Sequence, residues 1–517
     1  MTSRLRPFVS PLWVLIALSA WIGWLRAPSL HVTLWNVDES IHAAAARTLL
    51  EGGVMYRDAV DQRTPLTYYV FAAIFGVGGV NNLFAVRVVI TAMIAATAFG
   101  LFVIGRKTNG RVTGLCAAFL FAAFSSHLLY AQDTYAAHTE WFVAFFSTTA
   151  ALIFLHAESV PRFGRSLLIG AICALSFLSK QPGLTDLGAP VGTLIYLGLL
   201  RAAPRREIWR SLGGIVTGFL LTVLPVAALF VIAGAWKDGI FYTWTYNVQF
   251  YGPEIGWGDR LLSIAPFFAS LAHVYPFVLI AIVLAVIGLA LSVVQFRYLA
   301  TEYVRRRADG YLILWCVTSL VGAMSSGRGY AHYFFQCLPP FAWLAARAGD
   351  WLWAQISSTH SNLKRGLAGI GFVALAVSAL WTPLGARKVA PPPVDPAIPI
   401  ASFIRAHSTP ADKIFVWGYN PDIYLYANRA PASRFFYCSF QTGLIPWTNE
   451  VPGVDTTYAI VRGSMETLLA DLARHPPAFI VDCGVGPHRR FSKYPVQNFD
   501  VLYSLIQSHY VEVDPSS

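Results

Sequence analysis

Long apolar segments separated by short polar turns dominate the chain up to residue 388. A run of about 20 apolar residues is long enough to cross the hydrocarbon core of a bilayer, and the pattern predicts about eleven such helices. They cover residues 8–28, 83–104, 112–130, 141–157, 166–181, 184–200, 211–234, 266–295, 311–326, 333–348 and 366–384. The two segments between 166 and 200 are expected to be a helix pair broken at Gln181-Pro182-Gly183, because proline and glycine interrupt helices.

Three segments are too long to be turns. Residues 29–82 and 235–265 form long loops, and residues 389–517 follow a proline-rich hinge. Within the last segment the strand-like runs KIFVW, AFIVD and YVEV alternate with the helical patterns SMETLLADLAR and FDVLYSLIQSH, which is typical of an α/β domain. We therefore predict a polytopic α-helical membrane domain over 1–388, with interfacial helices in the outer loop 29–82, and a small soluble α/β domain over 389–517.

The composition and charge agree with a membrane protein. Of 517 residues, 56% are hydrophobic and only 13% are charged, against about 25% charged residues in soluble chains. Lys and Arg outnumber Asp and Glu by 38 to 27, an excess that suggests nucleic-acid binding in a soluble protein. Here most basic residues lie in short turns on one side of the predicted helices, as the positive-inside rule requires. We therefore expect an integral protein of the plasma (inner) membrane with a cytoplasmic N-terminus, the C-terminal domain outside, and no nucleic-acid partner.

The six cysteines include no CxxC pair. Cys438 and Cys483 are the only cysteines of the C-terminal domain. They form a disulfide if the domain lies in an oxidising compartment, or they remain two buried thiols, and the sequence leaves both alternatives open.

The first long loop, 29–82, carries a high density of charge between two apolar runs. Its carboxylates and arginines are Asp38, Glu39, Arg47, Glu51, Arg57, Asp58, Asp61 and Arg63. Residues 38–50 are expected to form a short helix, with Asp38 as its N-cap or in its first turn and a Gly-Gly pair at its end. Residues 66–78 are apolar but too short to span a membrane, which predicts an interfacial or re-entrant helix.

Two kinds of chemistry are possible in this loop. Asp38 and Glu39 directly follow the first predicted span, where a partly desolvated carboxylate can act as a general base; the alternative is favourable negative charge at a helix N-terminus. Arg63 precedes Thr64-Pro65, where a guanidinium can bind a phosphate at headgroup depth; the alternative is snorkelling to lipid headgroups.

The stretch AQDTYAAHTE places Asp133, His138 and Glu140 between two predicted helices, on the same outer side. It is too short to be a domain. Its carboxylates either line the mouth of a cavity or belong to a solvated turn.

Further ionisable groups lie within or close to the predicted spans. Lys180 and Asp186 flank the helix break, and charged groups at this depth usually face a partner or a cavity. They form an ion pair with each other, or Lys180 reaches a substrate phosphate. Arg328 and His332 lie at the outer end of a helix, where they either bind an anionic lipid head or anchor the helix in the interface.

Several chemistries have no motif in the chain. The 12 histidines form no HExxH motif and no His/Cys cluster at zinc spacing, so no metal is expected. There is no Walker A and no GxGxxG loop, so we expect no site for ATP or a dinucleotide, and no cofactor.

The motifs of the first loop resemble the GT-C membrane glycosyltransferases. The resemblance rests on Asp38-Glu39, on Gly53 and Tyr56-Arg57-Asp58, on Gln62-Arg63-Thr64-Pro65-Leu66, and on Tyr68-Tyr69. Weaker similarity is found at Lys180-Gln181-Pro182 and from His332-Tyr333 through Pro339-Pro340. The chain resembles most the bacterial branch of the protein O-mannosyltransferase family, which includes the lipid A aminoarabinose transferases, over about residues 1–350.

The resemblance implies inverting transfer of a sugar from a polyprenyl-phosphate donor to an acceptor hydroxyl or phosphate on the outer face, without a metal. Carried over by position, Asp38 is the catalytic base and Glu39 its neighbour in the acidic pair. Arg63 stands where the family has a lysine that contacts the donor phosphate, and Thr64-Pro65 replaces a Pro-Pro pair. The candidates for binding donor phosphate or acceptor are Asp58, Asp61, Arg63, Tyr68, Asp133, Glu140, Lys180, Arg328 and His332. The competing functions are a transporter or flippase of lipid-linked or small polar substrates, and a ligase or polymerase that uses a lipid-diphosphate glycan.

Overall fold

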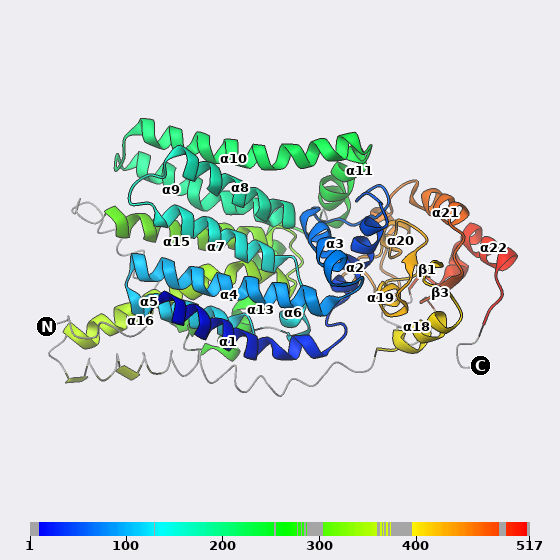
Figure 1. Cartoon of the computed structure of the whole chain (residues 1–517), viewed down its shortest axis with the longest axis horizontal. Helices are drawn as coiled ribbons and strands as arrows, with labels where there is room; N and C mark the ends of the chain where they lie inside the picture. Colours follow the sequence, from blue (N-terminus) through cyan, green and yellow to red (C-terminus); the bar gives the residue numbers. More distant parts are fainter. Residues whose placement is uncertain are drawn as a thin grey trace. The chain divides into compact units, whose positions relative to one another are not determined.

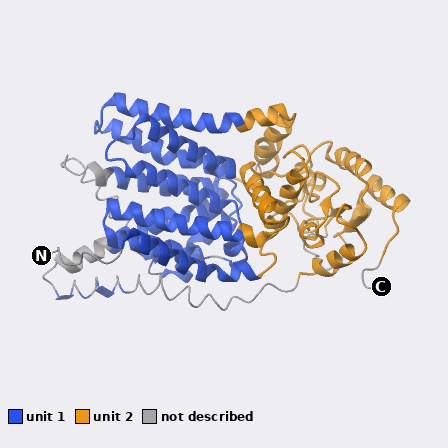
Figure 2. Cartoon of the chain, viewed as in Figure 1, with its two compact units in different colours: residues 1–31, 87–225, 257–390 blue, residues 32–86, 226–256, 391–517 orange. Residues whose placement is uncertain are grey.

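The protein divides into two compact units (Figure 2). The computed structural model describes residues 10–128, 130–252, 255–276, 303–358, 395–484 and 493–513, with scattered positions between 278 and 286 and between 362 and 373. Unit 1 is formed by the described residues within 1–31, 87–225 and 257–390, and unit 2 by those within 32–86, 226–256 and 391–517.

Unit 1 is helical, and its long helices lie side by side (Figure 1). Helix α16 packs on α5, α7 on α8, and α15 on α9. The elements that lie wholly or mainly in unit 1 are α1 (Pro11–His31), α4 (Leu83–Thr108), α5 (Arg111–Phe124), α6 (Ala131–Tyr135), α7 (Glu140–His156), α8 (Phe163–Ser179), η1 (Gln181–Leu187), α9 (Gly188–Leu199), α10 (Arg205–Ile232), α12 (Trp257–Leu262), α13 (Ala265–Val274), α15 (Tyr303–Met324), η5 (Ala331–Cys337) and α16 (Leu338–Ser358).

The number of spans predicted from the sequence is not confirmed. Among the described residues, three helices are long and apolar enough to cross a membrane by themselves, namely α1, α4 and α10. Helices α5, α7 and α8 are apolar but shorter, at 10–17 residues. The predicted span 366–384 falls largely outside the described residues, and 266–295 is described continuously only as far as 276. An apolar run therefore overestimates the length of a regular helix wherever turns interrupt it.

The predicted break between 166 and 200 is confirmed. Helix α8 ends at Ser179, and the 3₁₀ turn η1 separates it from α9. Gly183 packs so closely on the Ser176 carbonyl group that a Cβ at this position would collide with it. The Pro-Gly pair therefore ends the helix and also allows this close packing.

Unit 2 combines the first loop, the 226–256 segment and the C-terminal part of the chain. Helix α2 (Val37–Leu50) confirms the short helix predicted over 38–50, and α3 (Leu66–Gly78) confirms the predicted 66–78 helix. The segment from 235, expected to be a loop, is largely helical, with α11 (Trp236–Ile240) followed by the π-helical turns η2 (Phe241–Thr245) and η3 (Asn247–Tyr251).

The C-terminal part of unit 2 is α/β, as predicted. Its parallel sheet has the strand order β2-β1-β3, and its strands are β1 (Lys413–Trp417), β2 (Ala430–Pro431) and β3 (Phe479–Asp482). Ile414 lies opposite Phe479 in the central pair. The helical elements are α18 (Ala397–Ala406), α19 (Asp422–Ala427), α20 (Ser439–Thr442), η7 (Thr457–Ala459), α21 (Ser464–Arg474), η9 (Val496–Asn498) and α22 (Asp500–His509).

One predicted strand is wrong. Residues 510–513 follow α22 but pair with no strand among the described residues. The Tyr510 hydroxyl donates a hydrogen bond to the Pro477 carbonyl oxygen instead (2.9 Å). The third strand is the two-residue β2, which the apolar pattern did not indicate because it is short and contains a proline.

The C-terminal part shares its core with the two loops. The backbone amide of Val60 donates to the Arg434 carbonyl oxygen (2.9 Å), and the Tyr246 and Phe440 rings lie 5.0 Å apart between centroids. The compact unit is therefore larger than the 389–517 domain drawn from the sequence. Cys438 and Cys483 are both buried in this core as free thiols. The structure therefore has two unpaired thiols, not the alternative of a disulfide.

Candidate active site

Helix α2 begins with a capped first turn that presents Asp38. The cap is the Asn36 side chain, whose Oδ1 accepts a hydrogen bond from the Asp38 backbone amide (3.0 Å). Asp38 is therefore a first-turn residue rather than the N-cap. Glu39 is fully buried and accepts a hydrogen bond from the Trp35 backbone amide (3.0 Å), so its carboxylate stabilises the start of the helix.

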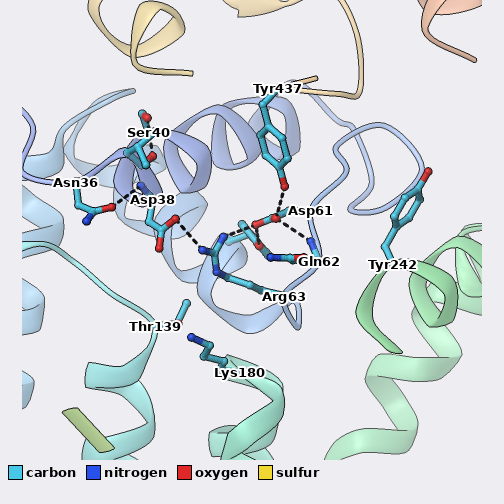
Figure 3. Close-up of polar contacts among 12 residues, drawn as sticks. Asn36, Asp38, Ser40, Asp61, Gln62, Arg63, Thr139, Lys180, Tyr242 and Tyr437 are labelled. Atoms are coloured by element: carbon cyan, nitrogen blue, oxygen red, sulfur yellow. Dashed lines mark hydrogen bonds and ion pairs between the residues drawn. The ribbon is translucent and has the colours of Figure 1, made fainter. Parts of the chain in front are cut away.

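Arg63 joins two carboxylates of the first loop (Figure 3). Its Nη2 lies 2.7 Å from Asp38 Oδ1, and its Nη1 lies 2.8 Å from Asp61 Oδ2. The Asp38 and Arg63 side chains are 10% and 12% exposed, and that of Asp61 is fully buried. The planar guanidinium suits this bridge because its N–H groups point in fixed directions. Asp38 therefore faces a cation in a largely buried position, not bulk water.

Asp61 accepts hydrogen bonds on both of its carboxylate oxygens. It accepts from the Tyr437 hydroxyl (2.7 Å), from the Gln62 backbone amide (2.7 Å) and from the Tyr68 hydroxyl. Burial opposes ionisation, but the Arg63 charge and the two tyrosine hydrogen bonds hold the pKa of Asp61 below its ordinary value. Asp61 therefore stays ionised and orients Arg63.

Burial works against the charge of Arg63 in the same way. Burial lowers the pKa of the guanidinium, and the charges of Asp38 and Asp61 raise it. The carboxylates have the larger effect, so the net pKa of Arg63 lies well above its ordinary value. Arg63 therefore stays charged between the two carboxylates.

Residues outside this group hold its backbone in place. The Tyr56 hydroxyl donates to the Arg63 carbonyl oxygen (2.9 Å), and Asn247 Nδ2 donates to the Gln62 carbonyl oxygen (3.0 Å). Tyr437, Asn247 and the Asn36 cap were not found by sequence reasoning. Tyr437 lies in the run RFFYCSF, which reads as hydrophobic core, and it is separated from Asp61 by 376 residues.

Tyr437→Phe tests whether the C-terminal part contributes to the site. The variant removes one hydrogen bond to a buried carboxylate, which costs about 1.5–3 kcal/mol, and we expect kcat to fall because Asp61 then holds Arg63 less firmly. The donor KM should stay unchanged. The matched control is Tyr503→Phe in α22, outside this group. Equal kcat values for the two variants, in an assay of the sugar transfer that the resemblance implies, would contradict the role of Tyr437.

Asp58 lies in unit 2 but outside this group. Its carboxylate pairs with Arg57 Nη2 (2.8 Å) and accepts from the Val54 backbone amide (2.8 Å). Burial raises the pKa of Asp58, but these two partners outweigh it and the net shift is downward. Arg57 also donates to the Ala233 carbonyl oxygen (2.9 Å). Asp58 therefore stabilises the turn that follows α2.

Unit 1 contains its own cluster of predicted site residues. Lys180 pairs with Glu140, and its ammonium group lies 3.8 Å from the centroid of the Tyr333 ring. His332 lies within ion-pair distance of both carboxylates of the cluster, at 3.9 Å from Glu140 Oε1 and 3.7 Å from Asp133 Oδ1. The structure therefore brings together Asp133, Glu140, Lys180 and His332, which lie far apart in the sequence.

Three more residues that the sequence singled out also lie in unit 1. The His138 ring stacks on that of His332, with centroids 4.1 Å apart. The alternative of a Lys180–Asp186 ion pair is wrong, because Lys180 pairs with Glu140 and Asp186 accepts from the Ser176 hydroxyl (2.5 Å). Arg328 lies in the turn between α15 and η5.

Comparisons with known proteins agree with the resemblance. Residues 62–235 match the family model described as dolichyl-phosphate-mannose-protein mannosyltransferase. ArnT from Cupriavidus metallidurans, solved bound to undecaprenyl phosphate, is 16% identical with a TM-score of 0.57, over 82% of this chain and 86% of that one. AglB from Archaeoglobus fulgidus is an oligosaccharyltransferase solved with an inhibitory peptide and a dolichol-phosphate. It is 14% identical with a TM-score of 0.55, over 89% of this chain and 68% of that one. None of the curated proteins compared matches the sequence.

The family match and the fold together confirm the resemblance to the GT-C membrane glycosyltransferases. The matched range contains Arg63 of unit 2, and Glu140 and Lys180 of unit 1. The roles of the individual residues, and the expectation that no metal is needed, stay predictions.

Proposed function

We propose that the protein transfers a sugar, with inversion, from a polyprenyl-phosphate donor to an acceptor hydroxyl or phosphate on the outer face of the plasma membrane. The observation that supports this most is the buried group in which Arg63 bridges Asp38 and Asp61, directly after the first candidate span. ArnT and AglB were solved with polyprenyl-type lipid phosphates, which is the chemistry that this proposal gives to the donor.

In the proposed reaction the acceptor oxygen attacks C1 of the sugar. The new C1–oxygen bond forms as the bond from C1 to the phosphate oxygen breaks, and the polyprenyl phosphate leaves. Asp38 takes the proton of the attacking hydroxyl as general base. The ion pair with Arg63 fixes the direction of the Asp38 carboxylate, and Asp61 holds the other side of the guanidinium.

The leaving phosphate gains negative charge as the bond breaks. A fixed cation that stabilises this charge is expected to be a large contribution to catalysis. The first candidate for this cation is Arg63, which its ion pairs with Asp38 and Asp61 hold in a fixed orientation. Lys180, His332 and Arg328 remain further candidates to bind the donor phosphate.

The function is tested with the purified chain in proteoliposomes that contain a polyprenyl-phosphate sugar labelled in the sugar. We expect release of polyprenyl phosphate and transfer of the label, both dependent on added acceptor. Movement of the lipid-linked sugar across the bilayer without cleavage would contradict the proposal and favour a flippase. Transfer only from a lipid-diphosphate glycan would replace it with a ligase or polymerase.

A further inference from the structure

Unit 2 contains a polar pocket whose lining is separate from the candidate active site. Its volume is about 310 Å³, at the lower end of the range of roughly 300–1,000 Å³ for small-molecule pockets. The C-terminal end of α2 and the following turn contribute Thr48, Glu51 and Asp58, and the C-terminal part of the chain contributes the rest of the lining. Neither Asp38 nor Arg63 is among the lining residues.

The carboxylates that line this pocket are each neutralised by an arginine. Asp471 binds Arg434 through two hydrogen bonds of 2.8 Å each, from Nε and Nη2. Glu51 pairs with Arg47 Nε (3.0 Å), and Asp58 pairs with Arg57 as described above. These negative charges are therefore already balanced by residues of the chain.

Three further basic side chains line the same pocket, and they are not balanced in this way. They are Lys413, Arg474 and His475. Lys413 has no side-chain hydrogen bond or ion pair with any described residue. Arg474 makes a long ion pair with Asp471 Oδ1 (3.8 Å), an oxygen that Arg434 Nη2 already holds at 2.8 Å. Partial burial and then the charges of Lys413 and Arg474 lower the pKa of His475. His475 is therefore a neutral hydrogen-bonding group, and Lys413 and Arg474 are the two positive charges that line the pocket beside it.

Two positive charges that line one pocket are stabilised when an anion binds between them. The lining also includes hydroxyl groups on Thr48 and Ser433 and three carboxylates, which are able to bind the hydroxyl groups of a ligand. An anionic group alone would leave these partners unused. The lining suits a ligand that joins an anion to several hydroxyl groups.

We propose that this pocket binds a phosphorylated sugar, with its phosphate on Lys413, Arg474 and His475 and its hydroxyl groups on the remaining polar lining. As part of the acceptor, such a sugar would be held by unit 2 during transfer, and this role rests on the proposed function. The binding itself does not, because the pocket and its charges are independent of Asp38.

The test is isothermal titration of the full chain in nanodiscs with glucose 6-phosphate, inorganic phosphate and glucose. We expect glucose 6-phosphate to bind at least about tenfold more tightly than either of the others, since a tenfold difference needs only one additional good polar contact. Equal binding of inorganic phosphate would overturn the sugar part of the proposal. Equal binding of glucose would overturn the anion part.

Variants show whether glucose 6-phosphate binds in this pocket or is attracted by the overall positive charge of the protein. Lys413→Ala and Arg474→Ala are each expected to weaken glucose 6-phosphate binding by about tenfold or more, and Lys413→Arg to retain it. The control is Arg462→Ala, which removes an exposed arginine of unit 2 that does not line the pocket. The same loss in Arg462→Ala, or no loss in Arg474→Ala, would overturn the proposal. The titration needs no donor and no turnover. A failed titration therefore does not contradict the proposed sugar transfer, and a lack of sugar transfer does not contradict the proposed binding of a phosphorylated sugar.

Discussion

Asp38→Asn is expected to abolish sugar transfer and to leave the protein folded. Asparagine has the shape of aspartate, and its amide oxygen can still accept a hydrogen bond from Arg63. It cannot take a proton from the acceptor, and the loss of a general base costs about 10²–10⁴-fold in rate. The second carboxylate on Arg63, Asp61, remains in place, so the network that holds the first loop is kept.

The measurements are the initial rate of polyprenyl phosphate release and the melting temperature in detergent. The matched control is Glu466→Gln, which neutralises an exposed carboxylate in the first turn of α21, outside the candidate site. A turnover of Asp38→Asn close to that of the control would remove Asp38 as the base. A rate loss accompanied by an equally large loss of folded protein would not support the assignment either, and Asp38→Glu then tests whether a displaced carboxylate restores part of the rate.

Arg63→Gln is expected to destabilise the protein more than Asp38→Asn or Tyr437→Phe does. It leaves Asp38 and Asp61 without the cation that now lies between them. Removing one partner of a buried ion pair costs about 3–5 kcal/mol, and transfer should be lost because Asp38 is no longer held in place. Arg63→Lys keeps the charge but cannot reproduce the two-sided bridge, so we expect a stability between those of the wild type and Arg63→Gln.

A double-mutant cycle assigns this effect to the bridge. Asp61→Asn and Arg63→Gln, alone and combined, should show a coupling energy of about 0.5–3 kcal/mol in thermal unfolding, as contacting residues do. Arg462→Gln is the control for loss of an exposed arginine in the same unit. Additive effects of the two substitutions would show that Arg63 does not depend on Asp61, contrary to the distances in the structure.

The sequence anticipated the parts of the fold that depend on local patterns. The 13-residue apolar run after Pro65 predicted α3 with the bounds that the structure has, because its length and hydrophobicity are properties of the segment itself. The strand β1 and the helix α21 were found for the same reason, since alternating and helical patterns are local. The strand predicted at 510–513 was wrong because a short apolar run does not show whether a partner strand lies beside it.

The candidate site was anticipated only in part. Asp38 and Arg63 belong to motifs of the first loop, and Asp61 was named as a carboxylate of the same loop, so the sequence gave all three as candidates. Their pairing could not be derived, because spacing along an irregular loop does not determine which side chains meet. Tyr437 had no signal at all, since a tyrosine in an apolar run is usually a core residue. For Lys180, proximity along the chain favoured Asp186, but the turn η1 directs that carboxylate to Ser176 instead.

The sequence by itself predicted a membrane protein that resembles the GT-C glycosyltransferases, found the charged loop after the first predicted span, and gave Asp38 as the candidate base. Composition and apolar run length carry the first of these, and the motifs of the resemblance carry the rest, without any long-range contact. Only the tertiary structure decided that Arg63 bridges two carboxylates, that Tyr437 orients one of them, and that the two loops share a core with the C-terminal α/β part. These arrangements depend on packing between segments separated by hundreds of residues, and each segment is locally compatible with many other partners.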